Sequence, residues 1–518
     1  MASVTDLLES TDRTFLFVVC ALVCLLSLAL WSSARPRGFP PGPRPLPFIG
    51  SIFSMTASPE EVFQKWSEEF GDVFGFKAGQ RWIVVINRHD AIREALTKHG
   101  VEFAGRPDFF SFGAFTYGFK DIIFSTFSET WKLHHKLASS ALRQFATGER
   151  LETMLHAAFG KLESFLADRE SQPVDPKLMI TLLLYNIMST MCFGKNYDFM
   201  EGKLLEWKEN NERLNQEFGM GVAADFFPWA RHLPTPGVRM VYRMRDVFHQ
   251  FVWDELESHK MNFDPDHVKD FVDLLLLAQR EARDGGGSDS DKFTDAHLML
   301  TVSNMFAAGI QTTTETLYWG IALMAEYQSI QAKIRAEIDE VVGCRRSPVL
   351  DDRGSLPFVE ATLYEVMRFS SILPIAVPHA TSCDVRFRGY HIPKGTVAMF
   401  NLHSMHFDSN VWDRPNIFLP ERFLDEKGAF RKPNVSFLPF GAGRRSCLGE
   451  VVAKADLFLI FTWLLQNYTF QKVPTKEGVN LLTVITNSSV GRHLENYEVS
   501  IERRSPYDPE KSVKAEKD

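Results

Sequence analysis

A ten-residue stretch around one cysteine constrains this 518-residue chain more than any other feature. It runs from Phe440 to Gly449 and reads FGAGRRSCLG. Gly443 lacks a Cβ, so the backbone there can take an unusual φ and pass close to a flat macrocycle. Arg445 offers a fork of donors that suits a propionate, and backbone N–H groups after the turn can point at the Cys447 sulfur. A thiolate held this way suits axial ligation of haem iron, where it favours O–O cleavage.

The stretch resembles the haem signature of the cytochrome P450 superfamily, Phe-x-x-Gly-x-Arg-x-Cys-x-Gly. Its five fixed positions are all filled: Phe440, Gly443, Arg445, Cys447 and Gly449. The resemblance extends from about Pro40 to Arg503. It implies a mainly α fold, a triangular prism of helices with small β-sheets. It also implies one haem b and activation of O2 by electrons from NADPH through a flavoprotein reductase. A lone cysteine without this pattern would more often be a buried structural thiol.

The amino-acid composition indicates which kinds of partner and which cellular compartment suit this chain. A hydrophobic content of 45% supports a sizeable core, and 44 phenylalanines suit an apolar cavity as well as packing. The net charge of −8 argues against nucleic acid as a partner. Six cysteines without a spacing pattern imply no disulfide framework and favour a reducing compartment.

The N-terminal region predicts a membrane anchor over residues 1–34. The apolar run from Phe15 to Trp31 is at the short end for a membrane span. Acidic residues precede it and Arg35 and Arg37 follow it, so the main domain should stay in the cytosol, at the endoplasmic reticulum membrane. A cleaved signal peptide is the alternative, because Ser32 to Ala34 resembles a cleavage site. The acidic flank speaks against it.

Three further segments complete the predicted domain organisation. The proline-rich stretch 35–50 is expected to be a stiff hinge between anchor and body. Residues 51–503 form the catalytic domain, and the charged tail 504–518 is expected to be disordered. Residues 109–127 are aromatic-rich without a clear period and predict an irregular loop. Helical patterns dominate elsewhere: 129–145, 149–169, 176–193, 204–218, 238–260 and a long helix after the expected cap Thr294.

Residues 307–314 of that long helix, AAGIQTTT, are poor helix interior because they combine glycine with β-branched threonines. A threonine hydroxyl can bond the carbonyl four residues back and bend the helix, which would open a groove beside it. Bound O2 could sit there, with Thr312 and an ordered water delivering protons. A helix that merely tolerates threonines is the alternative.

The superfamily motif at this place is Ala/Gly-Gly-x-Asp/Glu-Thr-Thr, and it implies that Thr312 is catalytic. Ala308, Gly309, Thr312 and Thr313 match it, whereas Gln311 replaces the acid. A glutamine can orient water but cannot release or accept a proton as a carboxylate does. Proton delivery is therefore expected to be slower, or to take another route.

The resemblance also assigns residues around the haem. Glu365 and Arg368, one helical turn apart, match the Glu-x-x-Arg motif, and with Arg422 they imply a buried structural network. Trp131 and His379 are expected near the propionates, and His135 stands where relatives carry arginine. Four basic residues would give a face on which an acidic NADPH–cytochrome P450 reductase could dock: Lys132, Lys136, Arg143 and Arg444.

Local segments point to two substrate classes. FAGRPD at 103–108 and YEVMRFSS at 364–371 resemble the aryl-hydrocarbon-hydroxylase family, which is the nearer resemblance. NVSFLPF at 434–440 is similar to steroid 17-alpha-hydroxylases, which come second. Both imply a flat, apolar substrate, which aromatic side chains pack well. The pocket positions implied are Phe124, Phe218, Ala308, Thr312 and Ile375 to Val377. A haem-thiolate isomerase or dehydratase, and a non-enzymatic haem-binding protein, remain the alternatives to a monooxygenase.

Overall fold

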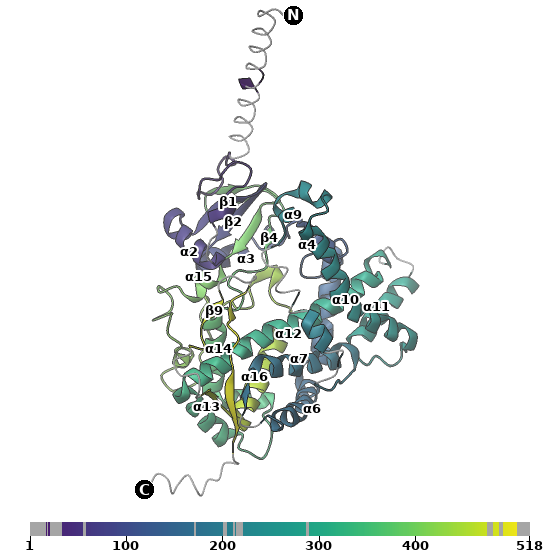
Figure 1. Cartoon of the computed structure of the whole chain (residues 1–518), viewed down its shortest axis with the longest axis vertical. Helices are drawn as coiled ribbons and strands as arrows, with labels where there is room; N and C mark the ends of the chain where they lie inside the picture. Colours follow the sequence, from purple (N-terminus) through teal and green to yellow (C-terminus); the bar gives the residue numbers. More distant parts are fainter. Residues whose placement is uncertain are drawn as a thin grey trace, which may run out of the picture.

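The computed structural model describes residues 17, 19–20, 34–54, 58–169, 172–199, 202, 205–210, 213, 221–285, 290–473, 480–485 and 491–504. Helices dominate this part of the chain, with small sheets beside them (Figure 1). The mainly α architecture predicted from the sequence is therefore confirmed. The predicted helix 204–218, the anchor and the tail beyond residue 504 fall largely or wholly outside the described residues.

Helix α12 (Asp295–Glu326) forms the centre of the core. It packs against α7 (Pro176–Phe193), α14 (Pro357–Ser370) and α16 (Glu450–Asn467), which surround it in Figure 1. Most residues of α12 are buried, so this helix is apolar on nearly all sides, as expected for a helix enclosed by others. Thr294 does precede it, but its hydroxyl pairs with His297 Nδ1 at 2.7 Å and does not cap a backbone N–H.

Helix α7 is long and apolar enough to cross a membrane, the one such helix in the described residues. However, 83% of that window is buried inside the protein. Asp175 caps its first turn by accepting a hydrogen bond from Lys177 N at 2.8 Å. Its apolar composition therefore reflects a place in the core.

The helices that the sequence predicted within the described residues have the expected bounds to within a few residues. No helix was predicted for His89–Thr97, Ala223–Phe226, Phe271–Asp284, Gln328–Val341 or Leu402–His406. The aromatic-rich stretch predicted as an irregular loop contains a short helix, α4 (Phe110–Phe115), whose Phe115 is buried against α10. Tertiary packing of that ring overrides the weak local pattern. The bounds of the others are α2 Pro59–Phe70, α3 His89–Thr97, α5 Glu129–Phe145, α6 Gly148–Ala167, α9 Ala223–Phe226, α10 Pro236–Asn262, α11 Phe271–Asp284, α13 Gln328–Val341 and α15 Leu402–His406.

The largest sheet has four strands in the order β1-β2-β7-β4. Strands β2 and β7 are parallel although they are far apart in sequence, and the other pairs are antiparallel. A second sheet has the order β3-β11-β8, and two hairpin-like pairs complete the set. The bounds are β1 Val73–Ala78, β2 Arg81–Ile86, β3 Pro173–Val174, β4 His379–Ala380, β5 Val385–Phe387, β6 Tyr390–Ile392, β7 Val397–Phe400, β8 Tyr468–Lys472, β9 Val484–Ile485, β10 His493–Leu494 and β11 Val499–Arg503.

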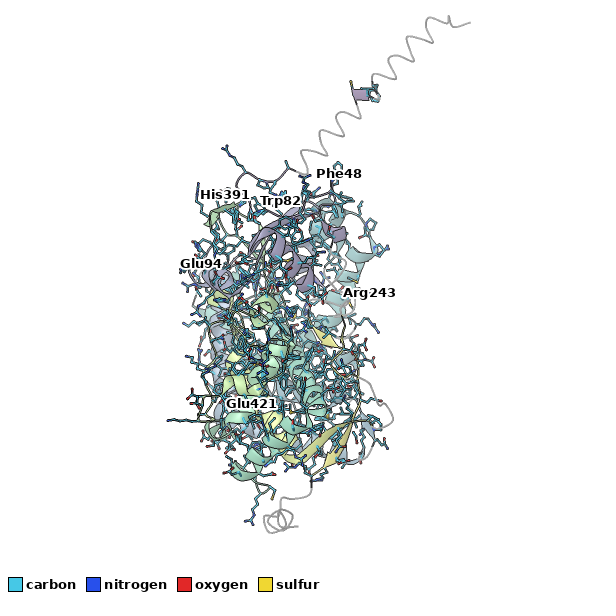
Figure 2. The ribbon with its side chains drawn as sticks, turned by 90° about the vertical axis from the view of Figure 1, so that its left-hand side faces the viewer. Phe48, Trp82, Glu94, Arg243, His391 and Glu421 are labelled. Atoms are coloured by element: carbon cyan, nitrogen blue, oxygen red, sulfur yellow. The ribbon has the colours of Figure 1, made fainter. Side chains whose placement is uncertain are left out.

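The proline-rich segment is attached to the body at strand β1. The Arg35 guanidinium donates to the carbonyls of Gly42 at 2.9 Å and Gly75 at 3.2 Å, and also to that of Pro40. Gly75 N in turn donates to Pro41 O at 2.7 Å. The segment is thus more than the stiff spacer that was expected, because its first half packs on the sheet. Figure 2 shows this end of the molecule by the labels of Phe48 and Trp82, with Glu421 toward the opposite end.

Candidate functional site

The Cys447 loop lies between a short 3-10 turn, Gly443–Arg445, and the start of α16. Cys447 N donates to Phe440 O at 2.9 Å and closes the loop. Desolvation raises the pKa of the Cys447 thiol, while a hydrogen bond from Gly449 N–H to the sulfur opposes this rise. The residue is nevertheless exposed. The thiol is therefore partly desolvated by its surroundings and still accessible.

Gly443 is required by a close approach, as the sequence predicted, but the neighbour in the structure is part of the protein. Its φ is +73°, and an added Cβ would lie 1.9 Å from Leu96 O, just before the end of α3. No other residue type fits without moving that backbone. Gly449, by contrast, has only Cys447 Sγ near its missing Cβ, at 4.0 Å.

Arg445 extends from this loop to the segment between α3 and α5. Its Nε donates to Ala104 O at 2.9 Å and its Nη2 to Ser125 O at 2.7 Å. Its guanidinium carbon lies 4.4 Å from the centre of the Trp131 ring. Desolvation lowers its pKa to about 10, so it stays charged at neutral pH. The buried Nη1 has no hydrogen-bond partner among the described residues, which leaves one charged donor for an anionic group such as a haem propionate.

Trp131 and His135, on consecutive turns of α5, lie beside Arg445. The indole Nε1 donates to Ile122 O at 2.8 Å, so the Trp131 N–H is already used within the protein. The two rings lie 4.5 Å apart. Desolvation, and secondarily the charge of Arg445, lower the pKa of His135. His135 is therefore neutral at pH 7, unlike the arginine that it replaces.

His379, in strand β4, joins the same group of residues. Its Nδ1 pairs with Phe103 O at 2.7 Å, and desolvation together with the charges of Arg106 and Arg445 holds its pKa well below the usual value. Arg106 was not singled out in the sequence. It donates to Ile123 O at 2.8 Å and Val377 O at 2.8 Å. Desolvation lowers its pKa to about 9. Because Arg106 contacts a segment about 270 residues away, no pattern in the sequence around it could have predicted this role.

The threonine-containing stretch of α12 has the predicted hydrogen bond, from Thr312 Oγ1 to Ala308 O at 2.8 Å. Ala308 is exposed, whereas residues 301–306 are buried and residues 309, 311 and 312 are half-buried. The helix is thus accessible at a small side chain within an otherwise buried element. The glycine at position 309 is required by packing between helices, because an added Cβ would lie 2.9 Å from Met188 Sδ of α7.

Gln311 contacts an acid one turn further along α12. Its Nε2 lies 3.4 Å from Glu315 Oε1. The Glu315 side chain is 3% exposed, and its carboxylate pairs with Lys177 Nζ at 2.8 Å and His493 Nδ1 at 3.2 Å. Glu315 was not predicted as a site residue, although its spacing from Gln311 places both side chains on one helical face.

The three residues of the predicted structural network are brought together. Arg368 donates to both carboxylate oxygens of Glu365, at 2.7 and 2.8 Å, and Arg422 Nε lies 3.1 Å from Oε1. Glu365 and Arg368 are fully buried. Arg368 also donates to His406 O at 2.7 Å. Two arginines around one carboxylate, each with further backbone partners, satisfy the charges that this fold buries.

Of the implied pocket residues, Phe124 stacks on Phe112 with ring centres 4.1 Å apart. Ile375 is buried and forms an isolated bridge with Asn401. Phe218 lies outside the described residues. The stacked pair provides a flat aromatic surface. The four residues of the expected basic face, Lys132, Lys136, Arg143 and Arg444, are all exposed.

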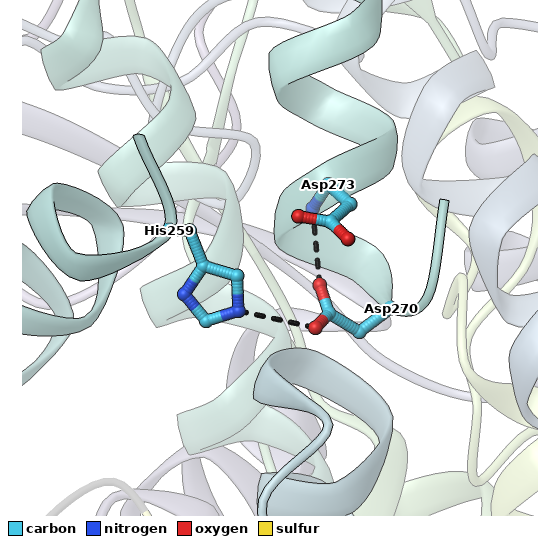
Figure 3. A group of neighbouring side chains, drawn as sticks. All are labelled: His259, Asp270 and Asp273. Carbon is cyan, nitrogen blue, oxygen red and sulfur yellow. Dashed lines mark hydrogen bonds and ion pairs between the residues drawn. The ribbon is translucent and has the colours of Figure 1, made fainter. Parts of the chain in front are cut away.

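A separate group of His259, Asp270 and Asp273 could supply three metal ligands within 4.8 Å of one another (Figure 3). Each acid already has a structural role. Asp270 caps α11 by accepting from Asp273 N at 3.0 Å and pairs with His259 Nε2 at 3.1 Å. Asp273 accepts from Lys269 N at 3.1 Å. We interpret the group as the start of a capped helix.

Comparisons with known proteins agree with this geometry. The cytochrome P450 family model matches residues 40–499. The chain is 32% identical to steroid 17-alpha-hydroxylase/17,20 lyase of Ictalurus punctatus, an alignment covering 88% of this chain and 91% of the relative. It is 35% identical to vitamin D(3) 25-hydroxylase of Sus scrofa (86% and 90%) and 33% identical to cytochrome P450 1A1 of Chelon auratus (88% and 91%).

These identities are too similar to separate steroid-type from aryl-hydrocarbon-type relatives, and the sequence segments were divided in the same way. The family assignment itself is confirmed over nearly the whole described body. The chain belongs to the cytochrome P450 family, the monooxygenases that bind haem and take electrons from NADPH through a reductase.

Proposed function

We propose that this cytochrome P450 monooxygenase hydroxylates or epoxidises a flat, apolar molecule of steroid or polycyclic aromatic type. The observation that carries the proposal is the pairing of an accessible thiol, Cys447, with a buried, charged and partly unpartnered guanidinium, Arg445, two residues before it. This pair fits a group that offers both a metal ion and a carboxylate. When bound, haem supplies activation of O2 so that one oxygen atom enters the substrate.

The chain's own residues then have distinct roles. Cys447 would bind the haem iron through its thiolate, and the Gly449 N–H bonded to its sulfur would tune the donor strength of that thiolate. Arg445 Nη1, His135 and His379 would bind the propionates, the histidines as neutral donors. Phe440 and Gly443 shape the loop, and Trp131 supports Arg445 through its ring face. Thr312 would hold a proton donor near the reacting oxygen.

Two observations favour a flat apolar substrate. The stacked rings of Phe112 and Phe124 give an aromatic surface, and Ala308 leaves room beside α12. The names of several relatives specify steroid or vitamin D substrates. A 17-alpha-hydroxylase-type activity on a steroid is therefore the second candidate, and oxidation of polycyclic aromatics follows from the resemblance to cytochrome P450 1A1.

The location follows from the N-terminal segment. Residues 1–34 would anchor the enzyme in the endoplasmic reticulum membrane, with residues 51–503 in the cytosol. NADPH–cytochrome P450 reductase would dock against the exposed basic face defined above, by charge complementarity.

The test uses the full-length chain in membranes with reductase and NADPH, and a panel of planar aromatics and steroids. We expect oxygenated products from at least one of the two classes, and a thiolate-type absorption band in the reduced, carbon monoxide-bound protein. Cys447→Ser should abolish both. Products from acidic or sugar substrates only, or a Cys447→Ser variant that retains the same band, would contradict the proposal.

A further inference from the structure

Position 311 of α12 lacks the acid of the family motif, and a different acid, Glu315, lies beside it. Gln311 stands where the family motif has an acid, and an amide cannot exchange a proton as a carboxylate does. The nearest acid is Glu315, one turn along the same helix, with its Oε1 3.4 Å from Gln311 Nε2. Residues four apart on a helix lie on one face, so the two side chains form one connected unit next to Thr312.

Glu315 is buried, but the two side chains that pair with it, Lys177 and His493, are partly exposed to solvent. Its own side chain is 3% exposed, whereas Lys177 is 25% and His493 20% exposed. Lys177 is supplied by the first turn of α7, and His493 by β10. Three elements that are distant in sequence thus converge on one carboxylate inside the core. A lone buried acid would not be retained as a charge in this way.

The surroundings keep this carboxylate ionised. Burial alone would raise the pKa of Glu315, but the hydrogen bond and charge of His493 and the charge of Lys177 bring it below the ordinary value. Among the described residues, Asp175, Tyr318 and Tyr497 are also nearby: burial chiefly raises the pKa of both phenols, and the charge of Asp175 acts in the same direction. The phenols stay neutral at physiological pH, and Lys177 and His493 are the side chains that pair directly with the carboxylate.

We propose that Glu315 has taken over, one helical turn away, the role of the acid missing at position 311. It acts as a positioning residue that fixes the Gln311 amide and passes protons from the solvent side toward Thr312. The inference rests on the proposed monooxygenase function and deepens it. The step moves protons only: the carboxylate accepts one from the His493 ring nitrogen that faces it and releases one through water oriented by Gln311. Solvent then returns a proton to the His493 ring, and no electrons are transferred.

The experiment compares four forms of the full-length, haem-loaded enzyme with reductase: wild type, Glu315→Gln, Gln311→Glu and the exchanged double variant Q311E/E315Q. The probe is whichever panel substrate gives most product, and the readouts are product and hydrogen peroxide per NADPH between pH 5 and 8. General acid–base groups contribute about 100-fold or more, so Glu315→Gln should lower product per NADPH by at least about 10-fold. Peroxide should rise, and Q311E/E315Q should recover most of the loss.

A matched control separates this role from a structural one. Glu326 is also on α12 and also pairs with a lysine, Lys472. Glu326→Gln should leave product per NADPH and its pH dependence unchanged. The proposal is overturned if Glu315→Gln behaves like Glu326→Gln, or if the exchanged double variant is no better than Glu315→Gln.

Two further measurements cover poor folding and the absence of turnover. If Glu315→Gln does not fold, His493→Gln, which keeps the Glu315–Lys177 pair, should also lower product per NADPH, because an amide cannot pass a proton from solvent to the carboxylate. In the resting protein, infrared difference spectra of wild type against His493→Gln or Glu315→Gln should show an ionised Glu315 carboxylate at pH 7. A protonated carboxyl there overturns the relay, whereas a wild type without thiolate-type absorption contradicts the proposed function instead.

Discussion

At the scale of single residues, this fold gathers charged side chains at positions that are buried or half-buried. Glu365, Arg368 and Arg422 form one such group, and Arg445 with Arg106 forms another. In the first group every charge has its partner within the protein. In the second, Arg445 keeps one N–H group unpartnered among the described residues. The contrast marks the first group as structural and the second as a place for a ligand.

Removing Glu365 should be costly, because Glu365→Gln leaves two arginine charges buried without their carboxylate. We expect the free energy of unfolding to fall by about 3–5 kcal/mol, measured by urea denaturation. The control is Glu421→Gln, which breaks the exposed pair of Glu421 with Lys333 and should cost about 0–1 kcal/mol. Equal losses for the two variants would contradict the structural role.

At the scale of elements, helix α16 follows directly from the cysteine loop and carries an acid that the fold does not accommodate. Asp456 is 4% exposed and its Oδ1 has no hydrogen-bond partner among the described residues. Desolvation raises its pKa from 3.8 to about 7. The folded chain therefore holds a proton that the unfolded chain releases above about pH 4.

It follows that the free energy of unfolding decreases as the pH rises from about 4 to about 7, because the unfolded state binds fewer protons in this window. Asp456→Asn should remove this dependence and stabilise the protein at pH 8 by up to about 4 kcal/mol, with no gain at pH 4. Urea denaturation at both pH values measures the difference. An equal effect of the substitution at both pH values would show that Asp456 does not titrate in this way.

Elements also show how far the sequence could predict this structure. Helices such as α7 and α12 follow from local patterns of apolar residues and end signals, so they were predicted closely. The Cys447 loop was equally predictable, because its chemistry lies within ten residues. By contrast, the parallel pairing of β2 with β7 and the contact between Glu315 and His493 join segments that only the folded core brings together. Local sequence carries no record of such contacts, which is why Arg106 was missed; for Glu315 the sequence shows only its spacing from Gln311, and not its pairing with Lys177 and His493.

At the scale of the whole molecule, the proposed orientation in the membrane makes a direct prediction. The sequence has three N-glycosylation sequons, which begin at Asn434, Asn467 and Asn487. A body that faces the cytosol never meets the glycosylation machinery of the lumen. The chain expressed in microsomes should therefore show no mass shift on treatment with an endoglycosidase. A variant with a cleavable secretion signal in place of residues 1–34 should show a shift from a glycan at Asn434. Glycans on the native chain would contradict the proposed orientation and would place the catalytic domain in the lumen.

The attachment of Arg35 to strand β1 has a mechanical consequence. Four carbonyl groups, on both the proline-rich segment and the sheet, hold that guanidinium. The chain therefore enters the catalytic domain at a point that hydrogen bonds hold in one position. If residues 1–34 anchor the enzyme as proposed, this attachment would fix the orientation of the catalytic domain relative to the membrane surface. The same side of the domain would then always face the apolar substrates dissolved in the bilayer.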